Sequence, residues 1–141
     1  MPNATANISK PQQAELMDGA RQAAQQAYAP YSGFRVGAAL LLENGAIVTA
    51  ANVENASYGL SMCAERSAVV RAVAEYGPAM RIAAAAVTNL NDAASSPCGA
   101  CRQVLAEFMA PGAPLFFPFD GTIQTHTLGE LFPLGFDLTH E

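Results

Sequence analysis

The chain has 141 residues, of which 51% are hydrophobic and 13% are charged. This balance predicts one compact domain with a packed core and excludes an intrinsically disordered chain. Its 7 basic and 12 acidic residues give a net charge of -5, which disfavours a nucleic acid as partner. No apolar run reaches the length of a membrane span, and residues 1–10 lack the order of a secretory signal. We therefore expect a cytoplasmic protein without a membrane partner.

A tail and a helix are expected at the start of the chain. Residues 1–10 are polar and lack periodicity, which predicts a mobile tail before a single domain over residues 11–141. Pro11 suits the first turn of a helix, and apolar residues recur at helical spacing after it. The pattern predicts a helix over residues 12–28 that ends before Pro30.

Two β-hairpins are expected, one in each half of the chain. Asn44-Gly45 and Asp120-Gly121 each separate two apolar or β-branched runs, and such dipeptides supply the positive φ values of a tight turn. The four strands predicted in this way cover residues 36–42, 47–53, 115–119 and 122–127.

A helix and a buried strand are expected between the hairpins. Alanine-rich residues 63–76 predict the helix, and Gly77-Pro78 is typical of its C-terminal end. The apolar run over residues 82–88 predicts the strand.

Two further helices are marked by their caps. Ser96 is expected to cap a helix that Pro97 opens and Pro111-Gly112 ends. Thr127 and Glu130 form a capping-box pattern that predicts a short last helix. The order of all elements indicates an α/β fold, with a single mixed β-sheet sandwiched between helix layers.

The three cysteines are the centre of the expected chemistry. An odd count cannot form a disulfide framework, and in a cytosolic chain it points to metal binding or catalysis. Cys98 and Cys101 lie three residues apart at a helix start, which places both sulfurs on one face. Cys63 stands at the entrance of the other helix, where it and Glu65 can both aim beyond the helix end.

The position of the cysteines at helix starts favours zinc binding. Helix N-termini carry partial positive charge, which favours the thiolate form that binds Zn²⁺. A structural zinc site is closed by four protein ligands, whereas a catalytic site keeps one position for water. Three cysteines with Glu65 beside them match the open type. Two alternatives remain, namely a closed site with His126 or His140 as fourth ligand, and a thioredoxin-like redox motif.

Two motifs resemble those of the zinc deaminases: Cys63-Ala64-Glu65 and Pro97-Cys98-Gly99-Ala100-Cys101. Residues 31–39, 52–56 and 98–104 are similar to the small homotetrameric cytidine deaminases. The resemblance covers nearly the whole chain after residue 12.

This resemblance implies a chemistry and an assembly. One Zn²⁺ per subunit would be held by Cys63, Cys98 and Cys101, and Glu65 would shuttle protons while water replaces the amino group of cytidine or 2′-deoxycytidine. Arg66 would offset the excess negative charge of three thiolates. The implied role is pyrimidine salvage by a homotetramer with shared active sites. An antibiotic nucleoside or a base within RNA is the alternative substrate, and a non-catalytic zinc module the alternative function.

The resemblance also implies nucleoside contacts, some of them across a subunit interface. Asn52 and Glu54 alternate at a strand end and can point the same way, and in relatives this pair binds the ribose 3′-hydroxyl. Ala56 and Tyr58 would lie near a neighbour's sugar, and Phe136 would stack on its pyrimidine. The substrate-binding residues expected are Phe34, Asn52, Glu54, Ala56, Tyr58, Ala64 and Phe136.

Overall fold

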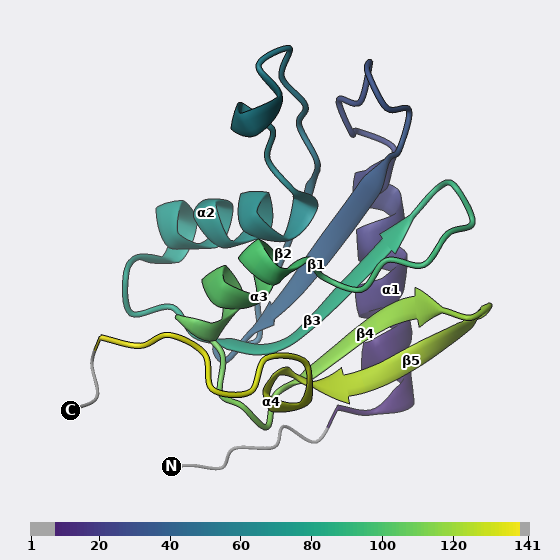
Figure 1. Ribbon diagram of the computed structural model, residues 1–141. Coiled ribbons are helices and arrows are strands. Elements are labelled where there is room, and N and C mark those ends of the chain that lie inside the picture. Colours follow the sequence, from purple (N-terminus) through teal and green to yellow (C-terminus); the bar gives the residue numbers. More distant parts are fainter. Residues whose placement is uncertain (1–7, 139–141) are drawn as a thin grey trace.

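One sheet is built from five strands, which are β1 (Val36–Leu42), β2 (Ile47–Ala51), β3 (Ile82–Asn89), β4 (Pro114–Phe119) and β5 (Thr122–Thr127). Their order in the sheet is β2-β1-β3-β4-β5 (Figure 1). Neighbours are antiparallel except β3 and β4, which are parallel, so the sheet is mixed. The computed structural model describes residues 8–138, and the first seven residues of the expected tail lie outside the described residues.

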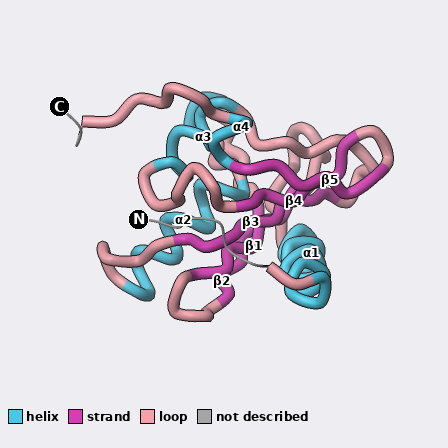
Figure 2. The backbone as a smooth tube through the Cα atoms, turned by 90° about the horizontal axis from the view of Figure 1, so that it is seen from below, coloured by secondary structure: helices cyan, strands magenta, loops and turns pink. Residues whose placement is uncertain are grey.

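Helices cover both faces of this sheet. Helix α1 (Lys10–Ala24) packs on one face, and α2 (Ala64–Tyr76) and α3 (Gly99–Ala106) lie on the other (Figure 2). A smaller hydrophobic cluster under α1 includes Leu16, and a larger one under α2 and α3 includes Leu105. The layers confirm the predicted α/β fold. No helix within residues 8–138 is long and apolar enough to cross a bilayer. The short helices are η1 (Tyr58–Leu60) and α4 (Leu128–Leu131).

Both hairpins are confirmed, and local turn chemistry explains them. Gly45 has a φ of 93°, and Asp120 and Gly121 have φ values of 52° and 79°. Two consecutive positive φ values are what a type I′ turn requires, and Asp120 and Gly121 supply them. In the first hairpin Gly45 alone has a positive φ, so the expectation of positive values at both Asn44 and Gly45 is wrong. The capping box between Thr127 and Glu130 is also present at the start of α4.

The first helix differs from its prediction at both ends. A capping box between Ser9 and Gln12 starts α1 before the predicted position 12. The predicted end at residue 28 is wrong, because the helix ends at Ala24. The backbone N–H of Tyr28 instead donates to the carbonyl of Asn52 over 3.0 Å. This non-local pairing competes with continuation of the helix.

The start of α3 also differs from its prediction. Cys98 is the N-cap, so the assignment of Ser96 as the cap is wrong. The Pro97 carbonyl accepts a hydrogen bond from Arg102 Nε over 2.7 Å, which satisfies it without a helix amide and lets the chain stay extended up to Cys98. The helix also ends well before Pro111, because the following residues pair with the start of β3.

Helix α1 comes very close to β1 at Gly37. A Cβ atom at this position would lie 1.8 Å from the carbonyl oxygen of Ala20 and 2.7 Å from the backbone nitrogen of Ala24. Both are backbone atoms of a buried helix face, so neither can move aside without shifting the helix. Glycine therefore sets the spacing between α1 and the sheet.

We expect Gly37→Ala to lower the free energy of unfolding by about 3 kcal/mol, because the added methyl overpacks a helix–strand contact. Urea unfolding of the purified variant measures this. Gly59→Ala is the matched control, since a Cβ there meets no atom within 4 Å. It should change stability by no more than about 0.5 kcal/mol. Equal stability of the two variants would contradict the close approach.

Candidate metal centre and active site

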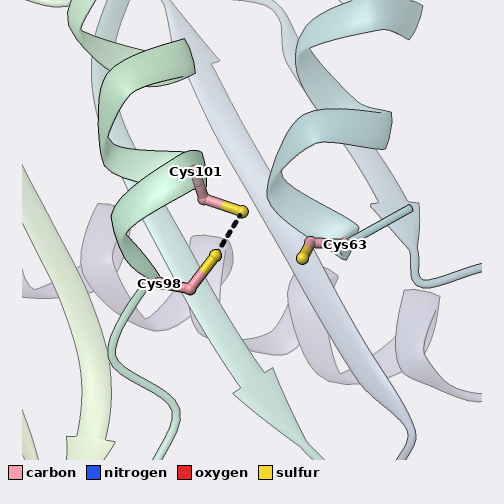
Figure 3. Close-up of side chains that lie close together, drawn as sticks. All are labelled: Cys63, Cys98 and Cys101. Carbon is pink, nitrogen blue, oxygen red and sulfur yellow. Dashed lines mark hydrogen bonds between the residues drawn. The ribbon is translucent and has the colours of Figure 1, made fainter. Parts of the chain in front are cut away.

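Three cysteines converge where two helices begin. Cys63 is the N-cap of α2, Cys98 is the N-cap of α3, and Cys101 lies in the first turn of α3. Their Sγ atoms all lie within 4.8 Å of one another, and those of Cys98 and Cys101 are 3.4 Å apart (Figure 3). Neither N-cap sulfur caps its own helix. The sulfurs are therefore available to a shared ligand.

The donor set fits Zn²⁺. Tetrahedral Zn–S bonds of about 2.3 Å place two sulfurs roughly 3.8 Å apart, close to the spacing observed. Contact with the Cys101 thiol, assisted by Arg66, lowers the pKa of Cys63. The same contact, together with burial, raises the pKa of Cys101. A divalent cation resolves this conflict by stabilising all three thiolates together. The cluster thus fits one Zn²⁺ per subunit.

The closed-site and redox alternatives find no support in this geometry. His126 stacks on Phe117 with ring centroids 5.5 Å apart, and its Nε2 lies 3.0 Å from Gln124 Oε1. Within residues 8–138 the metal-ligand cluster contains cysteines alone, and His140 lies outside that range. A redox pair would leave Cys63 without a role, yet its sulfur lies with the other two.

Glu65 and Arg66 lie directly beside the cysteines. Glu65 is only 6% exposed, and burial raises its pKa to about 7, with the charge of Cys63 adding to the effect. Such a carboxyl group can accept and return a proton near neutral pH. Arg66 Nη2 lies 3.7 Å from Cys63 Sγ and 3.3 Å from the Ser61 carbonyl oxygen. Its Nε is buried without a hydrogen-bond partner among the described residues. The guanidinium is thus placed to offset thiolate charge.

A cavity of ≈ 400 Å³ opens in front of these groups. It is lined by residues of the loops before β1, around η1 and after β3. Its volume suits a small molecule, and the cavity combines apolar walls with a few polar groups. The lining residues that had been expected from the sequence are Phe34, Asn52, Glu54, Tyr58, Cys63, Ala64, Glu65 and Cys98.

Asn52 follows the end of β2 and ties two loops together. This strand ends at Ala51, short of the predicted residue 53. Asn52 Oδ1 accepts from the Val36 N–H over 2.9 Å, and its Nδ2 donates to the Phe34 carbonyl over 2.9 Å. Among the described residues these are its side-chain hydrogen bonds, so one amide N–H remains for a ligand.

Glu54 is held by the loop before β1. Its Oε1 accepts from the N–H groups of Tyr31, over 3.0 Å, and Ser32, over 3.1 Å, and its Oε2 accepts from the Ser32 hydroxyl. The Ser32 hydroxyl in particular, with the two N–H groups, holds the pKa of Glu54 below its usual range. A carboxylate has about four acceptor sites, so one remains, on Oε2.

Comparison with known proteins identifies the family. The model of the "Cytidine and deoxycytidylate deaminase zinc-binding region" matches residues 10–114, which include all three cysteines and Glu65. The chain belongs to the cytidine and deoxycytidylate deaminase family.

Relatives in this family match most of the chain. A cytidine deaminase from Halalkalibacterium halodurans is 45% identical over 122 residues, covering 86% of this chain and 91% of the relative. One from Mycobacterium tuberculosis is 46% identical over 123 residues, covering 87% and 88%. The crystal structure of cytidine deaminase from Burkholderia pseudomallei matches with a TM-score of 0.79 and 41% identity, covering 87% of this chain and 98% of that one.

One chain does not bring every expected deaminase residue to the cavity. Ala56, Arg66 and Cys101 do not line the cavity, and Ala56 is exposed. Tyr58, which was expected near a neighbour's sugar, lines the cavity of its own chain and is 91% exposed. Phe136 is 69% exposed and borders a separate cavity of ≈ 550 Å³ next to α4. Its carbonyl accepts a hydrogen bond from Gln103 Nε2 over 3.0 Å.

Several cavity residues were missed by the sequence analysis. Ser32, Ser61 and Ser95 line the cavity, and so does Ser96, which had been assigned only as a helix cap. Ser32 lies within residues 31–39, which resemble the cytidine deaminases, but no role had been assigned to its hydroxyl. The usable signal was position, because Ser95 and Ser96 directly precede Pro97-Cys98.

We expect Cys101→Ser to reduce bound zinc from about one per chain to near zero after gel filtration, because a neutral hydroxyl replaces one of three thiolates. Mass spectrometry of the metal content measures this, and circular dichroism checks the fold. Glu107→Gln, at the exposed far end of the same helix, is the control and should retain zinc. Full zinc content in Cys101→Ser would refute the site.

Proposed function

We propose that this protein hydrolyses the exocyclic amino group of cytidine and 2′-deoxycytidine, yielding uridine or 2′-deoxyuridine and ammonia. One observation carries the proposal: buried Glu65 lines the same cavity as the Asn52 and Glu54 pair, together with two cysteines of the cluster, Cys63 and Cys98. Relatives at 45% and 46% identity that bear the name cytidine deaminase support the same reaction. The reaction serves pyrimidine salvage. Three free cysteines suit a reducing, cytoplasmic compartment.

The chemistry assigns Glu65 the proton transfers. When bound by the cysteines, Zn²⁺ supplies a Lewis acid that activates water as a nucleophile near neutral pH. Glu65 takes the proton of this water and delivers it to pyrimidine N3 as oxygen bonds to C4. Glu65 then moves the proton of the new C4 hydroxyl group to the amino group, the C4–N bond breaks as the C4 carbonyl forms, and ammonia leaves. One buried carboxyl with a pKa of about 7 serves as base and then as acid.

The sugar is recognised by the hydrogen-bonding positions that the loops leave open. Asn52 retains one N–H, and Glu54 retains one acceptor site on Oε2. A secondary hydroxyl both donates and accepts, so the ribose 3′-hydroxyl matches this pair. Phe34 borders the same cavity and offers an apolar surface to the sugar and base.

A homotetramer completes the site in this proposal. Ala56, Tyr58 and Phe136 are all exposed in the single chain, where a neighbouring subunit can meet them. In the assembly, Ala56 and Tyr58 approach a neighbour's sugar, and Phe136 stacks on its pyrimidine.

A substrate panel tests the reaction directly. Zinc-loaded protein is incubated with cytidine, 2′-deoxycytidine, adenosine and an aminated antibiotic nucleoside, and ammonia and the ultraviolet spectrum are followed. Release of ammonia from the two cytidines alone is expected. Turnover of the antibiotic alone would move the assignment to a different nucleoside, and no turnover by zinc-loaded protein would refute it.

Glu65→Gln should lower kcat by at least about 10³-fold while zinc stays at one per chain, because the amide cannot carry the proton. Stopped assays with cytidine and metal analysis of the same sample measure both quantities. Glu75→Gln is the control on the same helix, since Glu75 lies at the surface in an ion pair with Arg71. It should leave kcat unchanged. A Glu65→Gln enzyme with a tenth of normal activity would contradict the assigned role.

Phe136→Ala should raise KM for cytidine by about tenfold, the size of one lost base–aromatic contact. Leu138→Ala, an exposed change in the same segment, should leave KM unaltered. Light scattering of the unmutated protein should give four times the chain mass of 14.7 kDa. A monomeric, active enzyme with an unaffected KM in Phe136→Ala would overturn the shared site.

A further inference from the structure

Ser32 is hydrogen-bonded to both Glu54 and Phe34, two residues of the proposed sugar site. Its hydroxyl donates to Glu54 Oε2 and accepts from the Phe34 N–H over 2.9 Å. Its own N–H donates to Glu54 Oε1 over 3.1 Å. All three residues border the ≈ 400 Å³ cavity. A single exposed serine therefore connects two groups that face the nucleoside.

We propose that Ser32 is a positioning residue that orients the Glu54 carboxylate so that its one open acceptor site faces the 3′-hydroxyl of the nucleoside. This inference rests on the proposed function, because it requires a sugar beside Glu54. Ser32 acts through Glu54 and does not itself need to touch the substrate, since its hydroxyl proton is already donated to Oε2.

The physical need for Ser32 follows from the freedom of a glutamate side chain. The terminal torsion of glutamate has a broad energy profile, so a carboxylate held through one oxygen can still rotate. The N–H groups of Tyr31 and Ser32 hold Oε1 alone. The Ser32 hydroxyl holds Oε2, which fixes the plane of the carboxylate and occupies one of the two acceptor sites on that oxygen. Only one direction then remains for a ligand hydroxyl.

The Ser32 hydroxyl also couples the orientation of the Glu54 carboxylate to the position of Phe34. Because it accepts from the Phe34 N–H, the loop cannot move Phe34 without disturbing the bond to Glu54. Asn52 holds the Phe34 carbonyl from the other side. The short loop that contains Ser32 and Phe34 thus holds the Asn52 donor and the Glu54 acceptor in fixed positions relative to each other. A single ligand hydroxyl that bonds to both groups requires such a fixed arrangement.

Two ligands that differ only at the 3′ position isolate this role. Ser32→Ala and unmutated enzyme are assayed with 2′-deoxycytidine as substrate and with 2′,3′-dideoxycytidine as competitive inhibitor. We expect Ser32→Ala to raise KM for 2′-deoxycytidine by about tenfold, with kcat within about twofold of normal, because a binding contact is lost. The inhibition constant of 2′,3′-dideoxycytidine should not change, since that ligand has no 3′-hydroxyl.

Two further variants serve as controls. Ser32→Thr keeps the hydroxyl, and its extra methyl meets solvent because Ser32 is exposed, so KM should stay within about threefold of normal. Thr122→Val removes an exposed turn hydroxyl, which donates to the Phe119 carbonyl at the opposite hairpin, and should change neither constant.

The outcomes separate this inference from the proposed function. If the unmutated, zinc-loaded enzyme does not deaminate 2′-deoxycytidine, the proposed function fails. If that enzyme is active and Ser32→Ala weakens both ligands equally, Ser32 merely supports the loop and the inference is overturned. An unchanged KM for 2′-deoxycytidine in Ser32→Ala, or failure of Ser32→Thr to restore it, overturns the inference as well.

Discussion

The meeting of two helix N-termini over one face of the sheet is the constraint on which the site depends. Both α2 and α3 begin with a cysteine in extended conformation, so each sulfur projects from the helix end. The partial positive charge of the two helix ends favours thiolates there, and Arg66 adds a full charge 3.7 Å from Cys63 Sγ. Glu65 lies in the first turn of α2, so any shift of that helix moves the proposed metal ligand Cys63 and the proposed proton carrier together.

The two halves of the cavity are stabilised by different forces. The proposed catalytic half adjoins the hydrophobic core, since Ala64 and Glu65 are buried where they line the cavity. The proposed sugar half consists of loops held by hydrogen bonds, chiefly those of Asn52 and Glu54. In the proposed function, core packing therefore positions the groups that react, whereas a few hydrogen bonds, which single substitutions can alter, position the groups that recognise the sugar.

Sequence alone predicted those features that local chemistry determines. The hairpin at Asp120-Gly121 and the sheet between helix layers follow from turn residues and hydrophobic periodicity, and the structure confirms them. The errors fall where distant partners compete with local preference. Tyr28 pairs with Asn52 and is not part of α1. Arg102 donates to the Pro97 carbonyl, so that Cys98 rather than Ser96 caps α3. Neither contact has a signature within a window of neighbouring residues.

The same reasoning explains why the role of Ser32 is visible only in the folded chain. A serine two residues before Phe34 is compatible with an ordinary loop turn, in which its hydroxyl accepts from a nearby N–H. What distinguishes it is the donation to Glu54, a residue 22 positions away that sequence analysis had assigned to the sugar. Sequence motifs identify groups that contact a ligand. The residues that restrict the rotation of those groups are found by counting hydrogen-bond donors and acceptors in the folded chain. A carboxylate with three of its acceptor sites filled has only the fourth available for a ligand.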